Sequence, residues 1–514
     1  MRKNVLDYFF ETVKRMPDKV AVVHNSESIT FKDLQMRSMS VASYCLEKYN
    51  PERNVPVAVF LPKSIDVVVS NLASMYLGCI FSNLDVKTPL ERINNILAVM
   101  KPALIITNSE YVNFLKQSNS DNIAIVNIDE CDYSTSISEE VCQKLYNRID
   151  LQIDTDPFCI INTSGSTGTP KGVVLNHRSF FDFLAWATDS FDFDTNTVIG
   201  SLSPVVFDIY DFELCLMMFK GATIVQYDAG LAVFPAKLLM ELEKHKINFI
   251  FWVPTIMVNI ANMGLLDKFK LPDLKLIWFA GEVFPTKQFN VWRSHLKKAK
   301  FVNLYGPIEI TLDCIYFVAD EVQDESSPLP IGLPCKNTDI LILNENDKKC
   351  ESGEIGEICV RGTSLAMGYY NNAEKTAAAF VQNPLNELYP ELIYRTGDLA
   401  YVDERGLIMF KGRKDSLVKH MGYRIELGEI EHLIVNTLKL VKNCCVAYDY
   451  TEKMIVLFYE KSGNVSDIDI RKGLISVVPK YMIPTRYIVM EELPRNTNGK
   501  IDRLKLSNSL NLKR

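Results

Sequence analysis

The chain has 514 residues, of which 47% are hydrophobic and 23% are charged, a composition typical of a globular protein with a large buried core. That composition excludes a mostly disordered, collagenous or low-complexity chain. The 56 lysines and arginines against 63 aspartates and glutamates give a net charge of −7, which offers no reason to expect nucleic acid or an anionic membrane as a partner.

The N-terminal segment, residues 1–19, has no apolar core followed by a small-residue cleavage site, so a secretory signal is not expected. The most hydrophobic stretch, residues 247–263, contains Pro254 and three asparagines. It is too polar to span a membrane and predicts a buried strand followed by a helix. Twelve cysteines form no CxxC pair, which indicates free thiols in a reducing compartment. We therefore expect a cytoplasmic protein without membrane insertion.

Short apolar, β-branched runs alternate with longer amphipathic stretches along most of the chain. This alternation favours an α/β fold with layers of mostly parallel sheets. The clearest strands are predicted at residues 55–61, 103–108, 123–128, 158–163 and 248–253, and the clearest helices at 88–101 and 236–246.

The chain changes character at residues 410–420, FKGRKDSLVKH, a charged turn that contains a glycine. Beyond it, the pattern of apolar residues is that of a small α+β unit, with helices predicted at 428–438 and 469–478 and strands at 444–450 and 454–460. We therefore predict a large N-terminal domain, residues 1–412, and a small C-terminal domain, residues 413–514.

Residues 161–172, INTSGSTGTPKG, combine several hydroxyl side chains with three glycines and a lysine. Glycine lets a backbone approach an anion closely, and successive amide and hydroxyl groups form an anion-binding nest. Lys171 adds a positive charge, whereas Pro170 stands where a Walker A loop needs a glycine. Because strands are predicted on both sides, the segment predicts a phosphate site in a loop between two strands.

The segment TSGSTGTPKG resembles the signature loop of the adenylate-forming superfamily, which contains acyl-CoA ligases, luciferases and the adenylation domains of non-ribosomal peptide synthetases. Other segments resemble further motifs of this family, in the family's order, at residues 75–93, 303–311, 353–370, 394–399, 412–431 and 496–503. The resemblance implies a large N-terminal domain of layered, mostly parallel sheets with helices, followed by a small, mobile α+β C-terminal domain.

The resemblance also implies the reaction: a carboxylate is joined to AMP with release of pyrophosphate, and the acyl group then passes to a thiol. The residues that it assigns to ATP are Thr163, Ser164, Gly165, Ser166, Thr167, Gly168 and Lys171 at the phosphates, Asn303 and Tyr305 at adenine, and Asp398 and Arg413 at the ribose.

Two further residues are implied to be catalytic. Glu309 is the expected ligand of Mg²⁺, a hard oxygen donor for a hard cation. Lys500 resembles the mobile lysine that enters the ATP site and stabilises charge on the carboxylate and the α-phosphate. Asp415 resembles the hinge about which the C-terminal domain would rotate, withdrawing Lys500 and bringing the segment HMGYRIELGE to the site for the thiol step.

One position departs from the family pattern. The adenine motif usually contains YGPTE, in which a threonine hydroxyl lies near the α-phosphate, but here the residue is Ile308. Isoleucine cannot donate a hydrogen bond. Either another group takes over this role, or adenylation is slower than usual.

Residues 201–214 occupy the family's substrate motif, and Phe207-Asp208 match the pair whose aspartate binds the α-ammonium group of an amino acid. A helix N-cap or a surface aspartate is the alternative for Asp208. Phe212 and Trp278 are bulky, so a small pocket is expected, and Asp313 points weakly to a hydroxyl or a second amine. By position, the pocket should be lined by Ile209, Phe212, Trp278, Ala280, Leu304, Leu312 and Asp313.

No carrier-protein serine motif follows NGKIDR, so the expected acceptor is the phosphopantetheine arm of a separate carrier protein. The sequence therefore favours an amino acid–carrier protein ligase that uses ATP and Mg²⁺, with the layout of standalone enzymes such as those that load D-alanine. Two alternatives remain open: an acyl- or aryl-CoA ligase of the same fold, against which Asp208 argues, and a non-catalytic nucleotide-binding homologue, suggested by Ile308.

Overall fold

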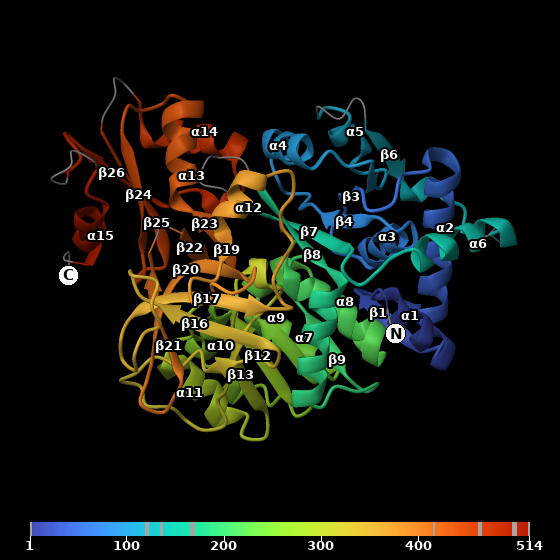
Figure 1. Cartoon of the computed structure of the whole chain (residues 1–514), viewed down its shortest axis with the longest axis horizontal. Coiled ribbons are helices and arrows are strands. Elements are labelled where there is room, and N and C mark those ends of the chain that lie inside the picture. The colour runs from blue at the N-terminus through green and yellow to red at the C-terminus, as the bar shows by residue number, and fades with distance from the viewer. Residues whose placement is uncertain are drawn as a thin grey trace.

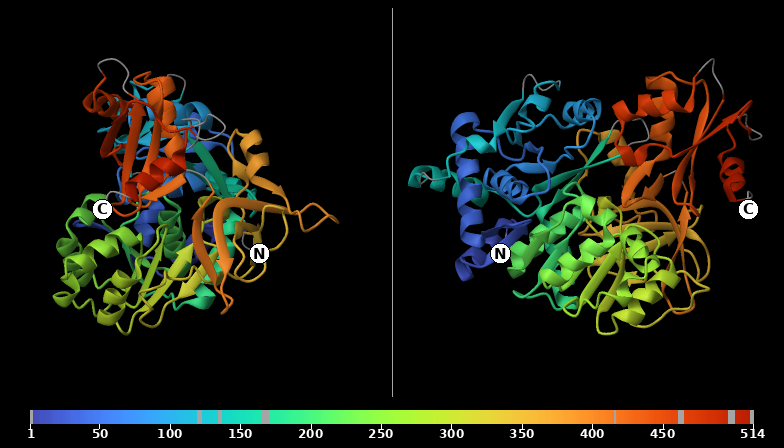
Figure 2. Two further views of the ribbon diagram at one scale, coloured as in Figure 1. Left: turned by 90° about the vertical axis from the view of Figure 1, so that its left-hand side faces the viewer. Right: turned by 180° about the vertical axis from the view of Figure 1, so that it is seen from behind.

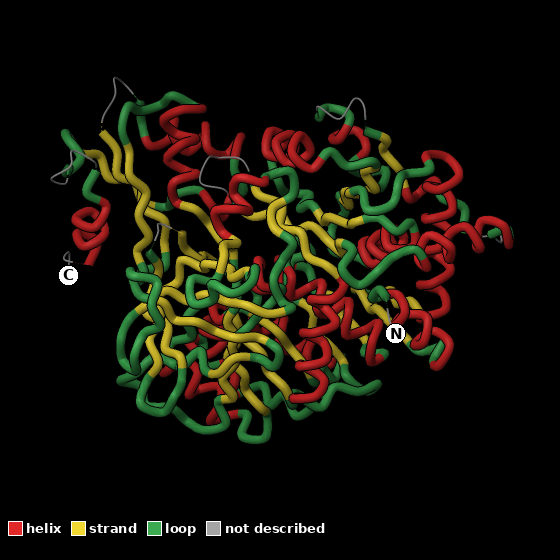
Figure 3. Tube along the Cα trace, viewed as in Figure 1, coloured by secondary structure: helices red, strands yellow, loops and turns green. Residues whose placement is uncertain are grey.

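A computed structural model describes residues 3–118, 123–133, 137–164, 170–414, 417–460, 465–495 and 501–511. Its larger part is built from three sheets and their helices, and a small C-terminal body lies beside α4 and above the third sheet (Figure 1). Figure 3 shows helices and strands alternating along the first two sheets, whereas strands and loops dominate the third. The predicted α/β class is therefore confirmed.

The first sheet carries the predicted phosphate loop. Its strands follow one another in space as β18 (Gly368–Tyr369), β8 (Lys171–Asn176), β7 (Pro157–Thr163), β4 (Ile80–Asn83), β3 (Pro56–Val59), β5 (Leu104–Thr107) and β6 (Ala124–Asn127). Pairing is parallel from β7 to β6, whereas β7 and β8 form an antiparallel hairpin. The strands predicted at 55–61, 103–108, 123–128 and 158–163 are all present.

The second sheet has nine strands, in the order β15 (Leu333–Pro334), β14 (Ile315–Val318), β13 (Lys300–Tyr305), β12 (Leu276–Ala280), β11 (Phe249–Trp252), β9 (Val198–Ser201), β10 (Thr223–Gln226), β1 (Val20–His24) and β2 (Glu27–Thr30). The strands from β13 to β1 run parallel, and the pairs at the two edges are antiparallel. The stretch 247–263 forms β11 and α10, as predicted, with Pro254 at the first turn of the helix.

Helices cover both sheets and fill the space between them (Figure 2). α3 and α8 are buried along almost their whole length, as expected of helices that are apolar on most sides. The helices of these two layers are α1 (Leu6–Arg15), α2 (Phe31–Tyr49), α3 (Ile65–Tyr76), α4 (Leu90–Met100), α5 (Val112–Leu115), α6 (Glu139–Asp150), α7 (His177–Ser190), α8 (Asp208–Lys220), α9 (Pro235–Lys244), α10 (Pro254–Asn262) and α11 (Thr286–His295).

The third sheet is antiparallel throughout, so the expectation of mostly parallel sheets holds for the first two alone. It contains β16 (Thr338–Leu343), β17 (Gly356–Gly362), β20 (Leu392–Val402) and β19 (Phe380–Gln382), with β21 (Ile408–Arg413) paired to β20 and α12 (Ala373–Ala379) beside it. Arg413, the first residue of the predicted C-terminal domain, is the last residue of β21 and lies opposite Asp398 in the third sheet.

The C-terminal body is a small α+β unit with its own apolar core. It begins with a hairpin of β22 (Leu417–His420) and β23 (Tyr423–Glu426), followed by α13 (Leu427–His432) and a turn of π-helix over Leu433–Thr437. Its sheet joins β24 (Cys444–Asp449), β25 (Met454–Glu460) and β26 (Arg486–Met490), with α14 (Asp467–Val477) and α15 (Arg503–Asn511) packed around it. No helix among the described residues is long and apolar enough to cross a membrane.

Candidate active site

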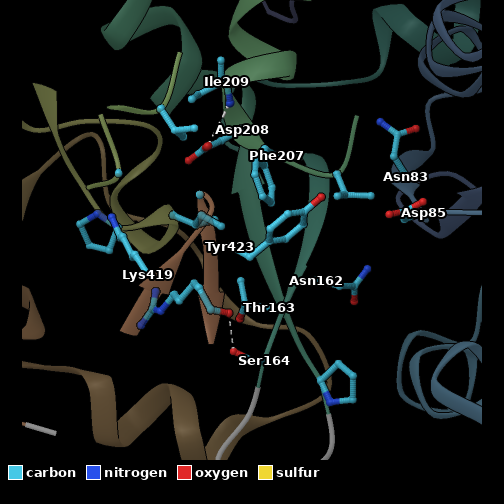
Figure 4. A pocket seen from close by; sticks show the side chains of 18 of the residues that line it. Asn83, Asp85, Asn162, Thr163, Ser164, Phe207, Asp208, Ile209, Lys419 and Tyr423 are labelled. Atoms are coloured by element: carbon cyan, nitrogen blue, oxygen red, sulfur yellow. Dashed lines mark hydrogen bonds between the residues drawn. The ribbon is translucent and has the colours of Figure 1, made fainter. Parts of the chain in front are cut away.

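A cavity of about 140 Å³ lies where the first two sheets meet the hairpin β22–β23 of the C-terminal body. Thr163 and Ser164 line it at the end of β7, and Asp208 and Ile209 line it at the start of α8. In Figure 4 the rings of Phe207 and Tyr423 lie between Asp208 on one side and Asn83 and Asp85 on the other. The two rings are 5.0 Å apart.

The end of the cavity next to β7 is the predicted phosphate site. The Ser164 hydroxyl donates to the Arg424 carbonyl oxygen at 2.7 Å and accepts from the Glu426 amide at 3.2 Å, so β7 is joined to β23. Lys171 donates to the Glu426 carboxylate at 2.9 Å. The predicted phosphate ligands Gly165, Ser166, Thr167 and Gly168 lie outside the described residues.

Glu309, the predicted Mg²⁺ ligand, is buried and has both carboxylate oxygens occupied. One accepts from the Tyr369 hydroxyl at 2.8 Å and the other from the Arg424 guanidinium at 2.6 Å. Burial alone would raise the pKa of Glu309, but Arg424 and Lys171 lower it to about 2. With Arg424 in this place the site does not fit Mg²⁺, because a guanidinium already holds the carboxylate.

The predicted nucleotide ligands gather around Asp398. Its carboxylate accepts from the Tyr305 hydroxyl at 2.5 Å and from the Arg413 guanidinium at 2.5 Å. The Asn303 side chain donates to the carbonyl oxygen of Pro330 at 2.7 Å. Burial, followed by the charge of Asp398, raises the pKa of Tyr305, so this hydroxyl stays protonated and can donate.

The opposite end of the cavity contains two carboxylates, Asp208 and Asp313. Asp208 is the first residue of α8 and accepts from the Ile209 amide at 2.9 Å, while Phe207 holds the N-cap position. Asp208 is therefore not a helix N-cap. Burial raises the pKa of Asp208 to about 6, and burial together with the charge of Asp208 raises the pKa of Asp313 well above its ordinary value.

The residues predicted to line the acyl pocket divide into two groups. Ile209, Ala280, Leu312 and Asp313 line the cavity together with Asp208. Phe212, Trp278 and Leu304 are buried and are not among its lining residues. The Phe212 and Trp278 rings stack on each other with centroids 5.3 Å apart.

Several residues of the cavity were not predicted individually. Arg424 and Glu426, on β23, hold Glu309 and Lys171, and Lys419, on β22, lines the cavity near Asp208 (Figure 4). The predicted segment at the site for the thiol step was 420–429, and no individual role was predicted for Arg424, Glu426 or Lys419. The charges of Arg424 and Glu426, at alternating positions in YRIE, are the signal that could have found these two residues, because alternate residues of a strand point to the same side.

Three other positions singled out in the sequence are Ile308, Lys500 and Asp415. Ile308 is half-buried and lines the cavity beside Pro307. Lys500, the predicted mobile lysine, and Asp415, the predicted hinge, both lie outside the described residues.

Comparison with known proteins identifies the family. The model of the AMP-binding enzyme family matches residues 9–370, which include the phosphate loop, Asp208 and Glu309. The chain belongs to this family of adenylate-forming enzymes. The chain is 30% identical over 503 residues to gramicidin S synthase 2 of Brevibacillus brevis, covering 98% of this chain and 11% of that protein. It is 29% identical to zwittermicin A synthase ZmaJ of Bacillus cereus, covering 96% of this chain and 93% of that protein.

Solved structures share the fold over the whole length. The Vibrio cholerae adenylation domain AlmE, in complex with glycyl-adenosine-5′-phosphate, superposes with a TM-score of 0.84 at 20% identity, covering 99% of this chain and 98% of that one. Holo-PA1221, a protein with adenylation and carrier domains, superposes with a TM-score of 0.82 at 22% identity, covering 98% of this chain and 84% of that one. Such enzymes have a large N-terminal and a small C-terminal domain, which is the predicted organisation.

Proposed function

We propose that the protein activates an amino acid with ATP as aminoacyl-AMP and then transfers it to the phosphopantetheine thiol of a separate carrier protein. The observation that carries this proposal is Asp208, a carboxylate that lines the cavity. Its environment penalises a bare negative charge, as the rise of its pKa to about 6 indicates. The α-ammonium group of an amino acid would supply the missing positive charge.

The size of the pocket supports an amino acid with a small side chain. The cavity has a volume of about 140 Å³. A solved relative in fold, AlmE, holds a glycyl adenylate. The names of the similar proteins, which are synthases of peptide products, and the carrier domain of PA1221 support a carrier protein as partner.

The groups at the nucleotide end suit the first half-reaction. Asp398, held by Tyr305 and Arg413, would accept hydrogen bonds from the ribose, and Lys171 would neutralise the phosphates once Glu426 is withdrawn. Lys500 would act in the same arrangement, with the amino acid carboxylate aligned on the α-phosphate. Mg²⁺ binding at Glu309 would belong to an arrangement in which Arg424 has left this carboxylate.

An acyl- or aryl-CoA ligase is the second candidate, because an o-succinylbenzoate CoA synthetase of Bacillus subtilis shares the fold with a TM-score of 0.83. Asp208 argues against it, since an acid without an ammonium group leaves this carboxylate unpaired. Comparing coenzyme A with a phosphopantetheinylated carrier protein as acceptor separates the two.

The test is amino-acid-dependent exchange of ATP and pyrophosphate across a panel of L-, D- and β-amino acids, followed by kinetics of Asp208→Asn. Removing one partner of a buried charge pair costs roughly 2–5 kcal/mol. We therefore expect kcat/KM for the best amino acid to fall at least about a hundredfold, since 1.36 kcal/mol is tenfold. The deaminated acid should lose much less, because it never used the pairing.

Asp211→Asn is the matched control, because Asp211 lies one turn further along α8, is buried, and faces Cys159 instead of the cavity. It should leave the ratio between the amino acid and its deaminated analogue unchanged. If Asp208→Asn weakens both acids equally, or neither, Asp208 is structural and the CoA ligase becomes the better proposal.

A further inference from the structure

Asp313 is a buried carboxylate of the cavity wall for which the α-ammonium group of a substrate does not account. The residue is only 4% exposed, and it lines the cavity together with Asp208. Among the described residues its carboxylate makes no hydrogen bond or ion pair. Burying a carboxylate without a partner is costly, so such a group is kept where a ligand completes its surroundings.

The backbone holds Asp313 at the cavity at a cost in free energy. The residue follows Thr311 and Leu312, whose φ angles of 54° and 66° lie in the left-handed region that residues with branched side chains rarely adopt. This turn packs directly on Gly306, where even a Cβ atom would overlap the Leu312 carbonyl oxygen. Backbone strain of this kind persists where the surrounding structure must hold a side chain for function.

The groups around Asp313 supply too little positive charge for it. Burial and the charge of Asp208 raise the pKa of Asp313 well above its ordinary value, and Lys419 opposes this rise. Lys419 makes no hydrogen bond or ion pair among the described residues, so neither carboxylate holds its ammonium. A further lining carboxylate, Asp85, lies on the opposite side of the aromatic ring pair from Asp208 (Figure 4). At the acyl end, one ammonium therefore faces two carboxylates.

The charges of an aminoacyl-AMP indicate what Asp313 lacks. An amino acid with one ammonium group gives an adenylate in which the ammonium and phosphate charges cancel. When Asp208 and Asp313 are ionised, they carry two negative charges against the single positive charge of Lys419, so this adenylate leaves one carboxylate uncompensated. A second ammonium group removes that deficit. A hydroxyl does not, and an asparagine would accept from a hydroxyl without the cost of a buried charge.

We propose that the substrate is a diamino acid, whose second ammonium group, on a short side chain, pairs with Asp313 while its α-ammonium group pairs with Asp208. The inference rests on the proposed function and names the class of amino acid. The side chain is short because the cavity has a volume of about 140 Å³. The two carboxylates also lie close together, since the charge that acts most strongly on Asp313 is that of Asp208. Asp313 is thus the residue that determines specificity for a second ammonium group.

The first experiment determines the class of amino acid with the wild-type chain. ATP–pyrophosphate exchange is measured with 2,3-diaminopropanoate and 2,4-diaminobutanoate, in both stereochemical forms. Each is compared with the amino acid that has a methyl group in place of the second ammonium (2-aminobutanoate, norvaline) and with the one that has a hydroxyl (serine, homoserine). We expect kcat/KM for the better diamino acid to exceed both counterparts at least about thirtyfold, which corresponds to roughly 2 kcal/mol, the low end for a buried charge pair.

The second experiment tests the residue with Asp313→Asn. The ratio of kcat/KM between the diamino acid and its methyl counterpart should fall at least about thirtyfold. Asp208→Asn should weaken both members of the pair, because both carry the α-ammonium group. Asp211→Asn is again the matched control and should leave the ratio unchanged, because Asp211 faces Cys159.

A binding measurement separates specificity from packing. The affinities of wild type and Asp313→Asn for the aminoacyl-sulfamoyl adenosines of the diamino acid and of its methyl counterpart should show the same fall in their ratio. A packing defect weakens both analogues alike and leaves the ratio where it was. If Asp313→Asn does not fold, the comparison of substrates with wild type decides alone.

Three results would overturn the inference. Wild type that prefers the methyl or the hydroxyl counterpart over each diamino acid would end this assignment and leave the proposed function intact. A ratio within threefold of wild type in folded Asp313→Asn would show that Asp313 does not bind the second ammonium group. If wild type exchanges ATP and pyrophosphate with no amino acid at all, the proposed function fails together with this inference, and that result is distinct from the other two.

Discussion

The two ends of the cavity differ in how their charges are satisfied. At the phosphate end, Glu309 pairs with Arg424 and Lys171 pairs with Glu426, so both predicted phosphate-end groups are held by charges from β23. At the acyl end, Asp313 and Lys419 have no ion pair among the described residues. The charges at the phosphate end are therefore satisfied within the protein, whereas the charges at the acyl end are left for a ligand to satisfy.

Paired charges and unpaired charges carry different information. A buried ion pair defines an arrangement of two bodies, because breaking it leaves a charge uncompensated. A buried charge without a partner is kept where a ligand supplies the missing one, so it marks a functional site. The ion pairs at the phosphate end thus define a closed state of the hairpin β22–β23. The unpaired charges at the acyl end indicate the charges that a substrate should carry.

The largest expected effect concerns Lys500, which should act when the phosphate end is open. Lys500→Ala should lower amino-acid-dependent ATP–pyrophosphate exchange by about 10²- to 10³-fold, because a cation at the developing charge is lost. Thioester formation from preformed aminoacyl-AMP should be largely retained. Equal loss in both steps would end the assignment of Lys500.

Asp208 offers a test of the acyl end without substrate. Its pKa is raised to about 6, above the value of about 3.9 expected in an unfolded chain, so its charge disfavours the folded state. The loss of folding free energy from ionised Asp208 is absent below about pH 4. It grows between about pH 4 and 6 and has its full size above about pH 6. Asp208→Asn should therefore stabilise the substrate-free protein at pH 8 by about 2 kcal/mol and have little effect at pH 4.

Thermal melting of wild type and Asp208→Asn at pH 4.5, 6 and 8 measures this effect. The expected gain in Tm is ~1–2 °C at pH 8, small because the chain is long. The same substitution is expected to lower activity, which is the combination typical of a residue kept for function. A variant that is less stable than wild type at pH 8 would place Asp208 in the structural scaffold instead.

The closed state can be weakened at the phosphate end through Glu426. Glu426→Gln removes the charge that holds Lys171, and a loss of about 1 kcal/mol from the closed state should tighten ATP binding about fivefold. Glu431→Gln is the matched control, because Glu431 pairs with Arg503 inside the C-terminal body. Isothermal titration with ATP measures both. An unchanged ATP affinity in Glu426→Gln would mean that the hairpin and ATP do not compete.

Much of the fold could be predicted from the sequence, because apolar runs of β-branched residues such as 158–163 and 248–253 have the length and flanking turns of buried strands. The antiparallel third sheet was not predicted. Its strand β20 alternates buried and partly exposed residues, which is the pattern of an antiparallel sheet with one covered face, and an expectation built on continuous apolar runs does not include such strands.

The site could be predicted less completely, for two physical reasons. The motifs indicated which residues lie near the acyl pocket, but the stacking of Phe212 on Trp278 depends on packing that no short motif specifies. Arg424 meets Glu309 across 115 positions of sequence, and this pairing depends on how the C-terminal body is placed against the sheets. Long-range placement of this kind is encoded by many weak contacts and by no single segment.

The smallest expected effect concerns Ile308, which lines the cavity on the same short turn as Glu309. Ile308→Thr should leave ATP–pyrophosphate exchange equal to wild type or up to about threefold faster, since a single added hydroxyl donor on a half-exposed side chain is worth about 0.5 kcal/mol, the lower end of the range for one hydrogen bond. The side chain is half-buried and threonine is smaller than isoleucine, so no clash is expected. Ile308→Val, which shortens the side chain without adding a donor, is the control and should not exceed wild type. If folded Ile308→Thr loses most of its exchange activity while Ile308→Val keeps it, the polar group disturbs this turn, and Ile308 belongs to a local packing that has replaced the threonine. A gain in Ile308→Thr alone would show instead that the phosphate end tolerates the hydroxyl, and that this chain adenylates without a donor that it could use.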